Sequence, residues 1–162
     1  MEELSKIKQG IKTELLRMEE DCVYSSKSHF NCADFLRKLY YIIGIPLVIL
    51  TAISTKYCIE IITLSAFILS AIQTFLNPYK MAENHKIAGN SYLEIKNTIR
   101  GFYSYEIYKL TDEEAIENIN CIKDGINKIN KTSPIPLNSG FKKALEGVRN
   151  GEAEYKVDKG DK

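Results

Sequence analysis

The sequence predicts an all-α protein in which a two-helix transmembrane hairpin extends into a cytoplasmic helical pair, with a third helix packed on that pair. Three observations predict this fold class. Residues 39–76 are mostly apolar, and their only charged residues are Lys56 and Glu60. Apolar or small residues recur three and four positions apart on both sides of this centre, which is the spacing of helices that pack side by side. Thr111 and Glu114 form a capping box, which opens a further helix.

The apolar centre divides into two candidate spans at residues 39–55 and 57–76. A bilayer core of about 30 Å requires roughly 20 mostly apolar residues in each crossing helix. In lipid the backbone must satisfy its own hydrogen bonds, so both spans are expected to be helices despite their β-branched residues. A buried helical pair in a soluble bundle is the alternative, but residues 39–54 lack the polar stripe of such helices. The pattern therefore favours a transmembrane hairpin over a soluble bundle.

Basic residues predict the orientation of the spans. They lie on both outer flanks, whereas the tip between the spans has a single lysine: Lys27, Arg37 and Lys38 before the first span, Lys80, Lys86, Lys96 and Arg100 after the second, and Lys56 at the tip. Positive flanks face the cytoplasm, so both termini are expected there. The N-terminal region has no signal-peptide pattern, and we expect the hairpin to direct insertion. Tyrosines mark the interfacial belts: Tyr40, Tyr41, Tyr57 and Tyr79.

Composition excludes several classes of function. The net charge is +1, which gives no reason to propose a nucleic-acid partner. The chain contains no G-x-S-x-G, H-E-x-x-H or glycine-rich phosphate loop, so we expect neither enzymatic activity nor a cofactor. The four cysteines form no C-x-x-C pair, and we expect no disulfide framework from Cys22, Cys32, Cys58 and Cys121.

The arm before the first span is expected to be one continuous helix that runs into the membrane. Its regularly spaced residues form a seam, the stripe that packs against the other arm: Leu4, Ile7, Ile11, Leu15, Met18, Cys22, Ser25, His29, Cys32, Leu36 and Leu39. Only Gly10 weakens the helix before residue 41. Gly44 and Pro46 are expected to bend the first span, because proline cannot donate a backbone hydrogen bond.

A second arm follows Asn77 and Pro78, where we expect a short break at the membrane surface. Its seam has the same spacing: Met81, His85, Ala88, Tyr92, Ile95, Ile99, Phe102 and Glu106. His29 and His85 are equally distant in sequence from Tyr57. In an antiparallel pair the two histidines should therefore lie at the same height above the membrane.

Residues 1–110 thus form the hairpin with its arms, and residues 111–150 form a C-terminal helical extension. The helix that starts at Thr111 should bury one face: Ile116, Ile119, Ile122, Ile126 and Ile129. Pro134 and Pro136 end it. Residues 141–148 form a short final helix at best, and the charged residues 151–162 are expected to be disordered.

The two arms together resemble the SLATT domain, a two-transmembrane effector domain associated with bacterial nucleotide-sensing conflict systems. The resemblance covers residues 15–105. It rests on the histidine helix before the first span, on the Gly-x-Pro at Gly44 and Pro46, and on the pattern of Ala82, His85, Ala88 and Tyr92. It implies an oligomer in the bacterial inner membrane that permeabilises the membrane in response to phage. We expect no nucleotide-sensing domain fused to these helices, so a separate sensor protein would supply the trigger.

Four polar residues and one phenylalanine on one face of the second span are the candidate pore lining: Glu60, Thr63, Phe67, Ser70 and Thr74. Polar groups inside a membrane are costly and are expected to face protein or water. In an oligomer Glu60 would attract cations, and Phe67 could form an apolar constriction. The alternative is that the hydroxyls bond to their own helix and that the small residues allow close packing.

The histidines allow three interpretations. His29, His85 and Tyr92 could form a pH-sensitive or oligomer-setting cluster, because imidazole titrates near neutrality. They could instead be packing residues that hydrogen-bond across the pair. A metal site with Cys32 lacks a fourth ligand and the usual close spacing, so we assign no metal.

The sequence therefore favours a membrane-embedded effector that oligomerises into a pore or disrupts the inner membrane during an antiviral response. The alternative is a non-conducting membrane anchor or scaffold, which would bind a partner protein through the helix over residues 112–130.

Overall fold

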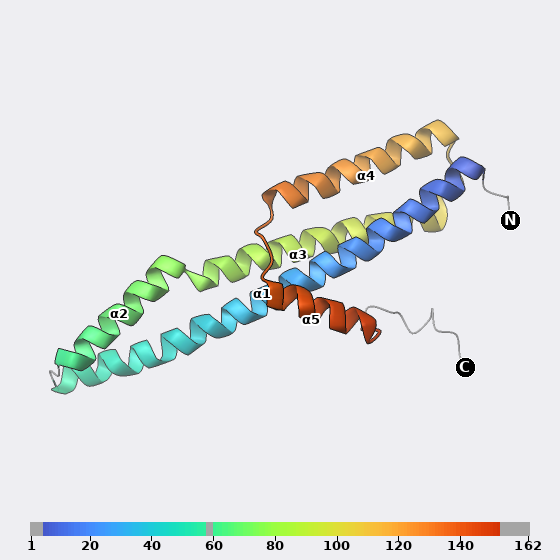
Figure 1. Cartoon of the computed structure of the whole chain (residues 1–162). Helices are drawn as coiled ribbons and strands as arrows, with labels where there is room; N and C mark the ends of the chain where they lie inside the picture. The colour runs from blue at the N-terminus through green and yellow to red at the C-terminus, as the bar shows by residue number, and fades with distance from the viewer. Residues whose placement is uncertain (1–4, 58–59, 153–162) are drawn as a thin grey trace.

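The computed structural model of the protein describes residues 5–57 and 60–152. Its helices are α1 (Lys6–Tyr57), α2 (Glu60–Leu76), α3 (Pro78–Gly101), α4 (Asp112–Thr132) and α5 (Asn138–Arg149), and a π-helical turn, η1 (Phe102–Glu106), follows α3 (Figure 1). The described residues form no strand. The predicted all-α class is confirmed.

The first arm and the first apolar segment form the single helix α1, as predicted. α1 contains 52 residues and is therefore about 78 Å long at 1.5 Å per residue. Pro46 lies inside it without ending it. A proline removes one backbone hydrogen bond, and the remaining bonds of the helix carry α1 past this point.

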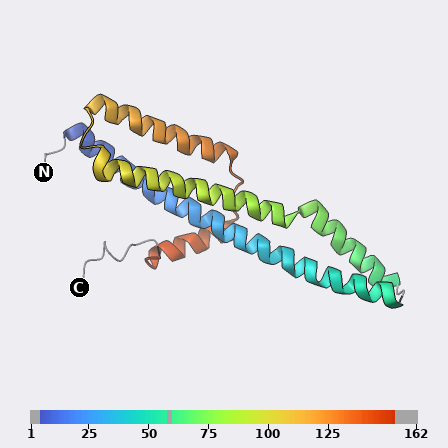
Figure 2. The ribbon, with the colours of Figure 1, turned by 180° about the vertical axis from the view of Figure 1, so that it is seen from behind.

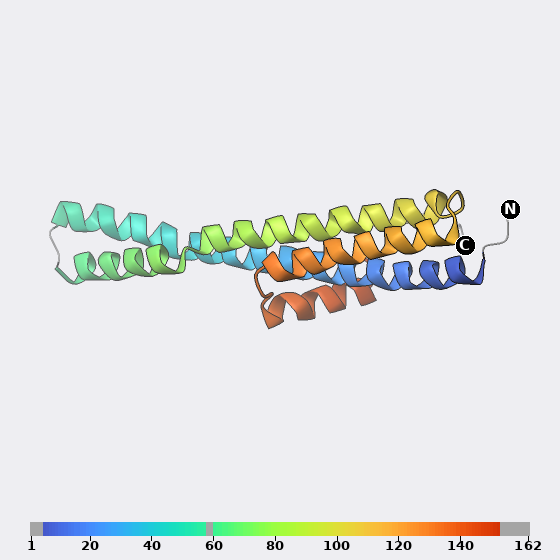
Figure 3. The same ribbon diagram turned by 90° about the horizontal axis from the view of Figure 1, so that it is seen from above.

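α2 and α3 run back along α1, so that α2 lies beside its C-terminal part and α3 beside its N-terminal part (Figures 1 and 3). The predicted break between them is present at Asn77, whose backbone is left-handed with φ 38° and ψ 58°. Its side chain accepts a hydrogen bond of 3.2 Å from the Lys80 backbone N–H, and Pro78 opens α3. Proline suits this first position because its missing N–H would have no helical partner there.

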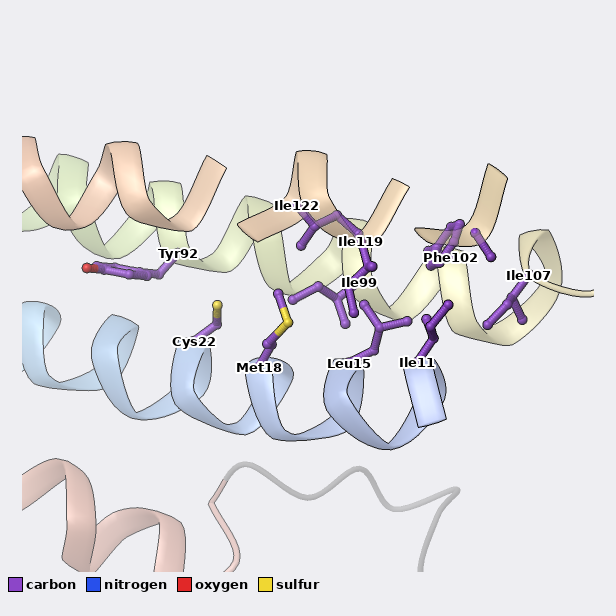
Figure 4. Close-up of a cluster of buried hydrophobic side chains, with 11 residues drawn as sticks. Ile11, Leu15, Met18, Cys22, Tyr92, Ile99, Phe102, Ile107, Ile119 and Ile122 are labelled. Carbon is purple, nitrogen blue, oxygen red and sulfur yellow. The ribbon is translucent and has the colours of Figure 1, made fainter. Parts of the chain in front are cut away.

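The main hydrophobic core lies in the arms, where α1, α3 and α4 meet (Figure 4). Leu15 of α1, Ile99 of α3 and Ala115 of α4 are completely buried. Leu15 and Ile99 lie on the two predicted seams. Ile119 and Ile122 bring the third helix onto the pair. The α4 N-terminus has the predicted capping box, because the Thr111 side chain accepts from the Glu114 backbone and the Glu114 side chain accepts from the Thr111 backbone.

Among the residues that the structure describes, the packing prediction is wrong at four positions; the predicted seam residue Leu4 lies outside the described residues. Ile7 is 48% exposed and Met81 is 45% exposed, and Ala82 is buried in place of Met81. On α4 Ile116 is largely exposed, and Ala115 occupies the buried position. The four residues that do not pack as predicted are Ile7, Met81, Glu106 and Ile116.

The error at Glu106 has a specific physical cause. The Ile107 N–H donates to the Phe102 carbonyl across five residues, at 3.0 Å. Such a π-helical turn holds more residues than an α-helical turn, so the next inward position comes one residue later. Ile107 is therefore completely buried, and Glu106 is exposed.

α4 and α5 lie on opposite sides of α1 (Figures 1 and 2). α5 extends from Asn138 to Arg149, beyond the short helix expected over residues 141–148, and it packs on α1 through Gly140, Ala144 and Gly147. Gly151 and Glu152 form a turn after it. The rest of the tail that was expected to be disordered, residues 153–162, lies outside the described residues.

Candidate functional site

The outer surfaces of the apolar segments are exposed to an unusual degree. α1 and the stretch that begins with α2 are each long and apolar enough to cross a membrane, and only 6% and 11% of their most apolar windows are buried. Helices of this kind in a soluble core would be mostly buried. Large side chains point outward along both segments: Ile42, Ile45, Val48, Ile49, Ile61, Leu64, Phe67, Ile68 and Phe75. Both stretches are therefore candidates for membrane-crossing helices.

The two apolar segments touch each other through small and polar residues. Ala66 is buried between them, and the Ser54 and Thr63 hydroxyls are hydrogen-bonded to each other. Nearer the arms, the Gln73 side chain packs over Gly44, where a Cβ atom would lie 3.5 Å from the Gln73 amide nitrogen. Small residues and cross-helix hydroxyl bonds are typical of helix pairs in lipid.

All five candidate pore-lining residues lie on the exposed part of α2: Glu60, Thr63, Phe67, Ser70 and Thr74. Phe67 is 71% exposed. The Thr74 hydroxyl donates to the Ser70 carbonyl at 2.8 Å, and Thr63 is bonded to Ser54 of α1. The structure therefore places the five on the exterior of a single chain, and two of the three hydroxyls are satisfied within that chain.

Three tyrosines of the predicted aromatic belt lie together where the arms meet the apolar segments. Tyr40 lies with its ring centroid 5.4 Å from that of Tyr41 and 5.5 Å from that of Tyr79 on α3. The side chain of Tyr57 lies outside the described part of the structure. The three described tyrosines lie at one level, next to the Asn77 break.

His29 and His85 meet in the middle of the arms. Their Nδ1 atoms lie 3.0 Å apart, their ring centroids 5.1 Å apart, and the side chains are only 2% and 3% exposed. The structure therefore brings the two histidines to the same height. Tyr92 completes the cluster, with its ring stacked on His29 at 5.5 Å between centroids and its hydroxyl donating to the Asn130 side chain on α4.

The surroundings keep this histidine pair uncharged. Burial, followed by the proximity of His85, lowers the pKa of His29 to about 4, and burial lowers the pKa of His85. In a neutral pair one Nδ1 donates its proton and the other accepts it. Burial also raises the pKa of Tyr92. The cluster is thus a set of neutral groups that connects α1, α3 and α4 at neutral pH.

Metal binding does not fit these residues. Within residues 5–57 and 60–152, no group of three or more His, Cys, Asp or Glu side chains could hold a metal ion. Cys32, the third candidate ligand, instead accepts a 3.2 Å hydrogen bond from the Leu137 backbone N–H. Burial raises the pKa of its thiol, which opposes the thiolate form that a metal requires.

Two polar contacts in the arms were not predicted. Glu19 is 8% exposed, accepts from the Tyr103 hydroxyl at 2.8 Å and pairs with Arg100 at 3.1 Å. The Cys32 contact with Leu137 fixes the segment that leads into α5. Glu19 does lie next to the seam residue Met18, which is the only sequence signal for its burial.

Comparison of the chain with models of known protein families, with curated proteins and with solved structures finds no match for any of the three.

Proposed function

We propose that the protein is an integral membrane protein whose α1 and α2 cross the bilayer and whose arms remain on one side of it. The observation that carries this proposal is the exposure of the apolar segments: only 6% of the most apolar window of α1 and 11% of that in the stretch beginning with α2 is buried. Such a surface in water would be an aggregation liability, whereas in lipid it needs no further cover. The basic flanks at Arg37, Lys38 and Lys80 support a cytoplasmic position for the arms.

We further propose that several copies assemble and make the membrane permeable. Glu60, Ser70 and Thr74 are exposed on the outside of a single chain, where lipid would surround them. Intramembrane polar residues are costly unless they face protein or water. An assembly with this stripe inward would give it a wet environment and would place Phe67 as an apolar constriction.

The setting of this activity comes from the resemblance of residues 15–105 to the SLATT domain. That resemblance favours a bacterial inner-membrane effector that acts in an antiviral response and that is triggered by a separate sensor protein. α4 and α5 lie outside its range, and they offer surfaces through which a sensor could act.

A non-conducting anchor or scaffold is the second candidate, and one observation favours it. The hydroxyls of Thr63 and Thr74 already have partners within the chain, so these two residues do not require a wet pore. In that case α4 would hold a partner protein, and the spans would serve only to anchor the arms.

Dye and ion leakage from liposomes separates the two candidates. The full chain is reconstituted, and flux is measured for the wild type and for the double variant Glu60→Leu/Ser70→Leu. A pore lined by this face predicts that flux falls to background while insertion is preserved. Thr51→Leu is the matched control, because Thr51 is exposed on α1, outside the stripe, and its hydroxyl bonds to the Leu47 carbonyl at 2.8 Å.

Undiminished flux in the double variant would contradict the proposed lining. A wild-type chain that inserts and oligomerises without any flux would instead identify the protein as a scaffold. Recovery of the chain in water without detergent would contradict membrane insertion itself.

A further inference from the structure

One face of α1 combines a cation, an aromatic ring and an apolar surface across the expected membrane boundary. Arg37, Tyr41, Gly44 and Val48 are spaced four, three and four residues apart, so they lie on one side of the helix. Arg37 is exposed, Tyr41 is 53% exposed and Val48 is 69% exposed. At 1.5 Å per residue, this face extends about 16 Å from the cation to the valine.

A groove of about 420 Å³ follows this face. Gly44 forms part of it because glycine has no side chain to fill the space. Gln73 of α2 borders it beside Gly44, and its other lining residues are mainly aliphatic: Ile45, Leu47, Val48 and Ile49. Tyr40 and Tyr41 stand at the end of the groove that is nearer the arms. The groove therefore changes from aromatic at the membrane surface to aliphatic toward the membrane interior.

Unpaired cations stand beyond the aromatic end. Arg37 and Lys38 are exposed and lie one turn from Tyr41, and Lys80 is exposed near Tyr79 on α3. Within the described part of the chain, no salt bridge or hydrogen bond engages the side chains of these three cations. Asp34 and Glu83 are the nearest acidic residues in sequence, and both are exposed. Three cations against two carboxylates leave this rim positively charged.

We propose that this groove binds an anionic glycerophospholipid of the surrounding membrane. One acyl chain lies along Gly44 and Val48, and Arg37 with Lys38 holds the phosphate. Tyr41 stands between them at the level of the glycerol esters, where amphipathic aromatic rings are favoured. The inference rests on the proposed insertion of α1 and α2 into a bilayer, but it does not depend on pore formation.

The charge of the rim favours a lipid over a second copy of the chain. Two copies in one membrane hold their arms on the same side, so a symmetric contact through this groove would bring Arg37 and Lys38 of both chains to the same height. Like charges placed face to face oppose such a contact. An anionic headgroup is attracted by the same cations.

The chain contains no tryptophan, so one introduced tryptophan can report on neighbouring lipids. Val48→Trp places the reporter in the groove, and Ile68→Trp places it on exposed α2 surface outside the groove. Because Gly44 lies opposite Gln73, Val48 and Ile68 lie four and five residues farther into the membrane and are matched in depth. Each full-length variant is reconstituted in phosphatidylcholine vesicles that contain a minor fraction of acyl-brominated lipid.

We expect brominated phosphatidylglycerol to quench Val48→Trp more strongly than the same fraction of brominated phosphatidylcholine does, and to quench Ile68→Trp no more strongly. Adding Arg37→Gln and Lys38→Gln should remove this preference, because each cation contributes about fivefold to the relative affinity for the anionic lipid. Lys109→Gln with Lys128→Gln removes the same charge from exposed sites, one between η1 and α4 and one on α4, and should leave the preference intact.

Equal quenching by the two brominated lipids at Val48→Trp would overturn the proposal, as would an equal preference at Ile68→Trp. Quenching of neither tryptophan by either lipid would instead mean that the chain is not inserted, which contradicts the proposed function. Quenching of Val48→Trp that falls as the protein-to-lipid ratio rises would show that a second copy covers the groove, and this too would overturn the proposal.

Discussion

His29 of α1 and His85 of α3 share one hydrogen bond between their Nδ1 atoms, which lie 3.0 Å apart in the interior of the arms. Burial lowers the pKa of both imidazoles, so both rings are uncharged at neutral pH. The pair therefore acts as a neutral polar link between the arms. As a switch it would respond to acid well below neutrality, not to small changes around pH 7.

Acidification should destabilise the arms through this pair. A histidine of the unfolded chain titrates near pH 6.5, whereas the pKa of folded His29 is about 4, so the unfolded state binds more protons between these values. The folded arms therefore have their full stability above the pKa of the unfolded chain, and they lose it as the pH falls toward the pKa of folded His29. The free energy of unfolding should drop by about 2 kcal/mol at pH 5. Thermal unfolding of the full chain in detergent, followed by circular dichroism, measures this loss.

The double variant His29→Asn/His85→Asn provides the control for the acid effect. An asparagine amide can occupy the position of Nδ1 and hydrogen-bond without titrating. The unfolding temperature of the double variant should change much less between neutral and acidic pH than that of the wild type. An equal acid loss in this variant would assign the effect to other groups.

The all-helical fold could be predicted from the sequence because it depends on local periodicity. The equal height of His29 and His85 could be predicted by counting residues from the turn between the two apolar segments. The spacing that placed Leu15 and Ile99 on facing seams was sufficient, and both are completely buried. The same counting failed at Glu106, since a π-helical turn shifts the register and has no signature in the spacing. The prediction that Met81 is packed was wrong because α3 begins as a separate helix at Pro78, after the Asn77 break. This start directs Ala82 inward in place of Met81.

The contacts of the C-terminal extension could not be predicted, because they join residues more than 100 positions apart. No local pattern indicates that the Leu137 N–H donates to Cys32. Nor does the sequence indicate that Gly140 is the point of closest approach to α1. The groove beside Gly44 also depends on the position of Gln73, which only the packed helices establish.

Gly140→Ala should release α5 from α1. A Cβ atom at this position would lie 2.9 Å from the Ser28 carbonyl and would collide with the Cys32 sulfur, and the backbone of α1 cannot yield. Such overpacking costs on the order of 1–3 kcal/mol. The Cys32 thiol, which is completely buried, should then react with a maleimide about tenfold faster or more. Peptide mapping after labelling measures this rate at Cys32 itself.

Gly10→Ala is the matched control for that experiment, because nothing lies within 4 Å of a Cβ atom added at Gly10. It should leave Cys32 unreactive. An unchanged rate in Gly140→Ala would mean that α5 does not dock on α1 as the structure describes.

Glu19→Ala should destabilise the arms by about 1–3 kcal/mol. The Glu19 carboxylate is almost buried and holds both the Tyr103 hydroxyl and the Arg100 guanidinium, so its loss removes the acceptor of the Tyr103 hydroxyl and the ion-pair partner of Arg100. Glu20→Ala, on the exposed neighbour, should change the unfolding temperature little. Equal unfolding temperatures for the two variants would show that the buried contact contributes nothing.

Asn77 should tolerate glycine better than alanine. Its φ of 38° lies in the left-handed region, which costs a residue with a Cβ atom about 1–2 kcal/mol unless its side chain compensates, and its side chain caps α3 through the Lys80 N–H. Asn77→Gly loses only the cap, whereas Asn77→Ala loses the cap and also meets the backbone strain. The unfolding temperature in detergent should therefore fall in the order wild type, Asn77→Gly, Asn77→Ala. Equal unfolding temperatures for Asn77→Ala and Asn77→Gly would mean that α2 and α3 can join without a left-handed residue. The break that lets α2 and α3 both follow α1 would then have another cause.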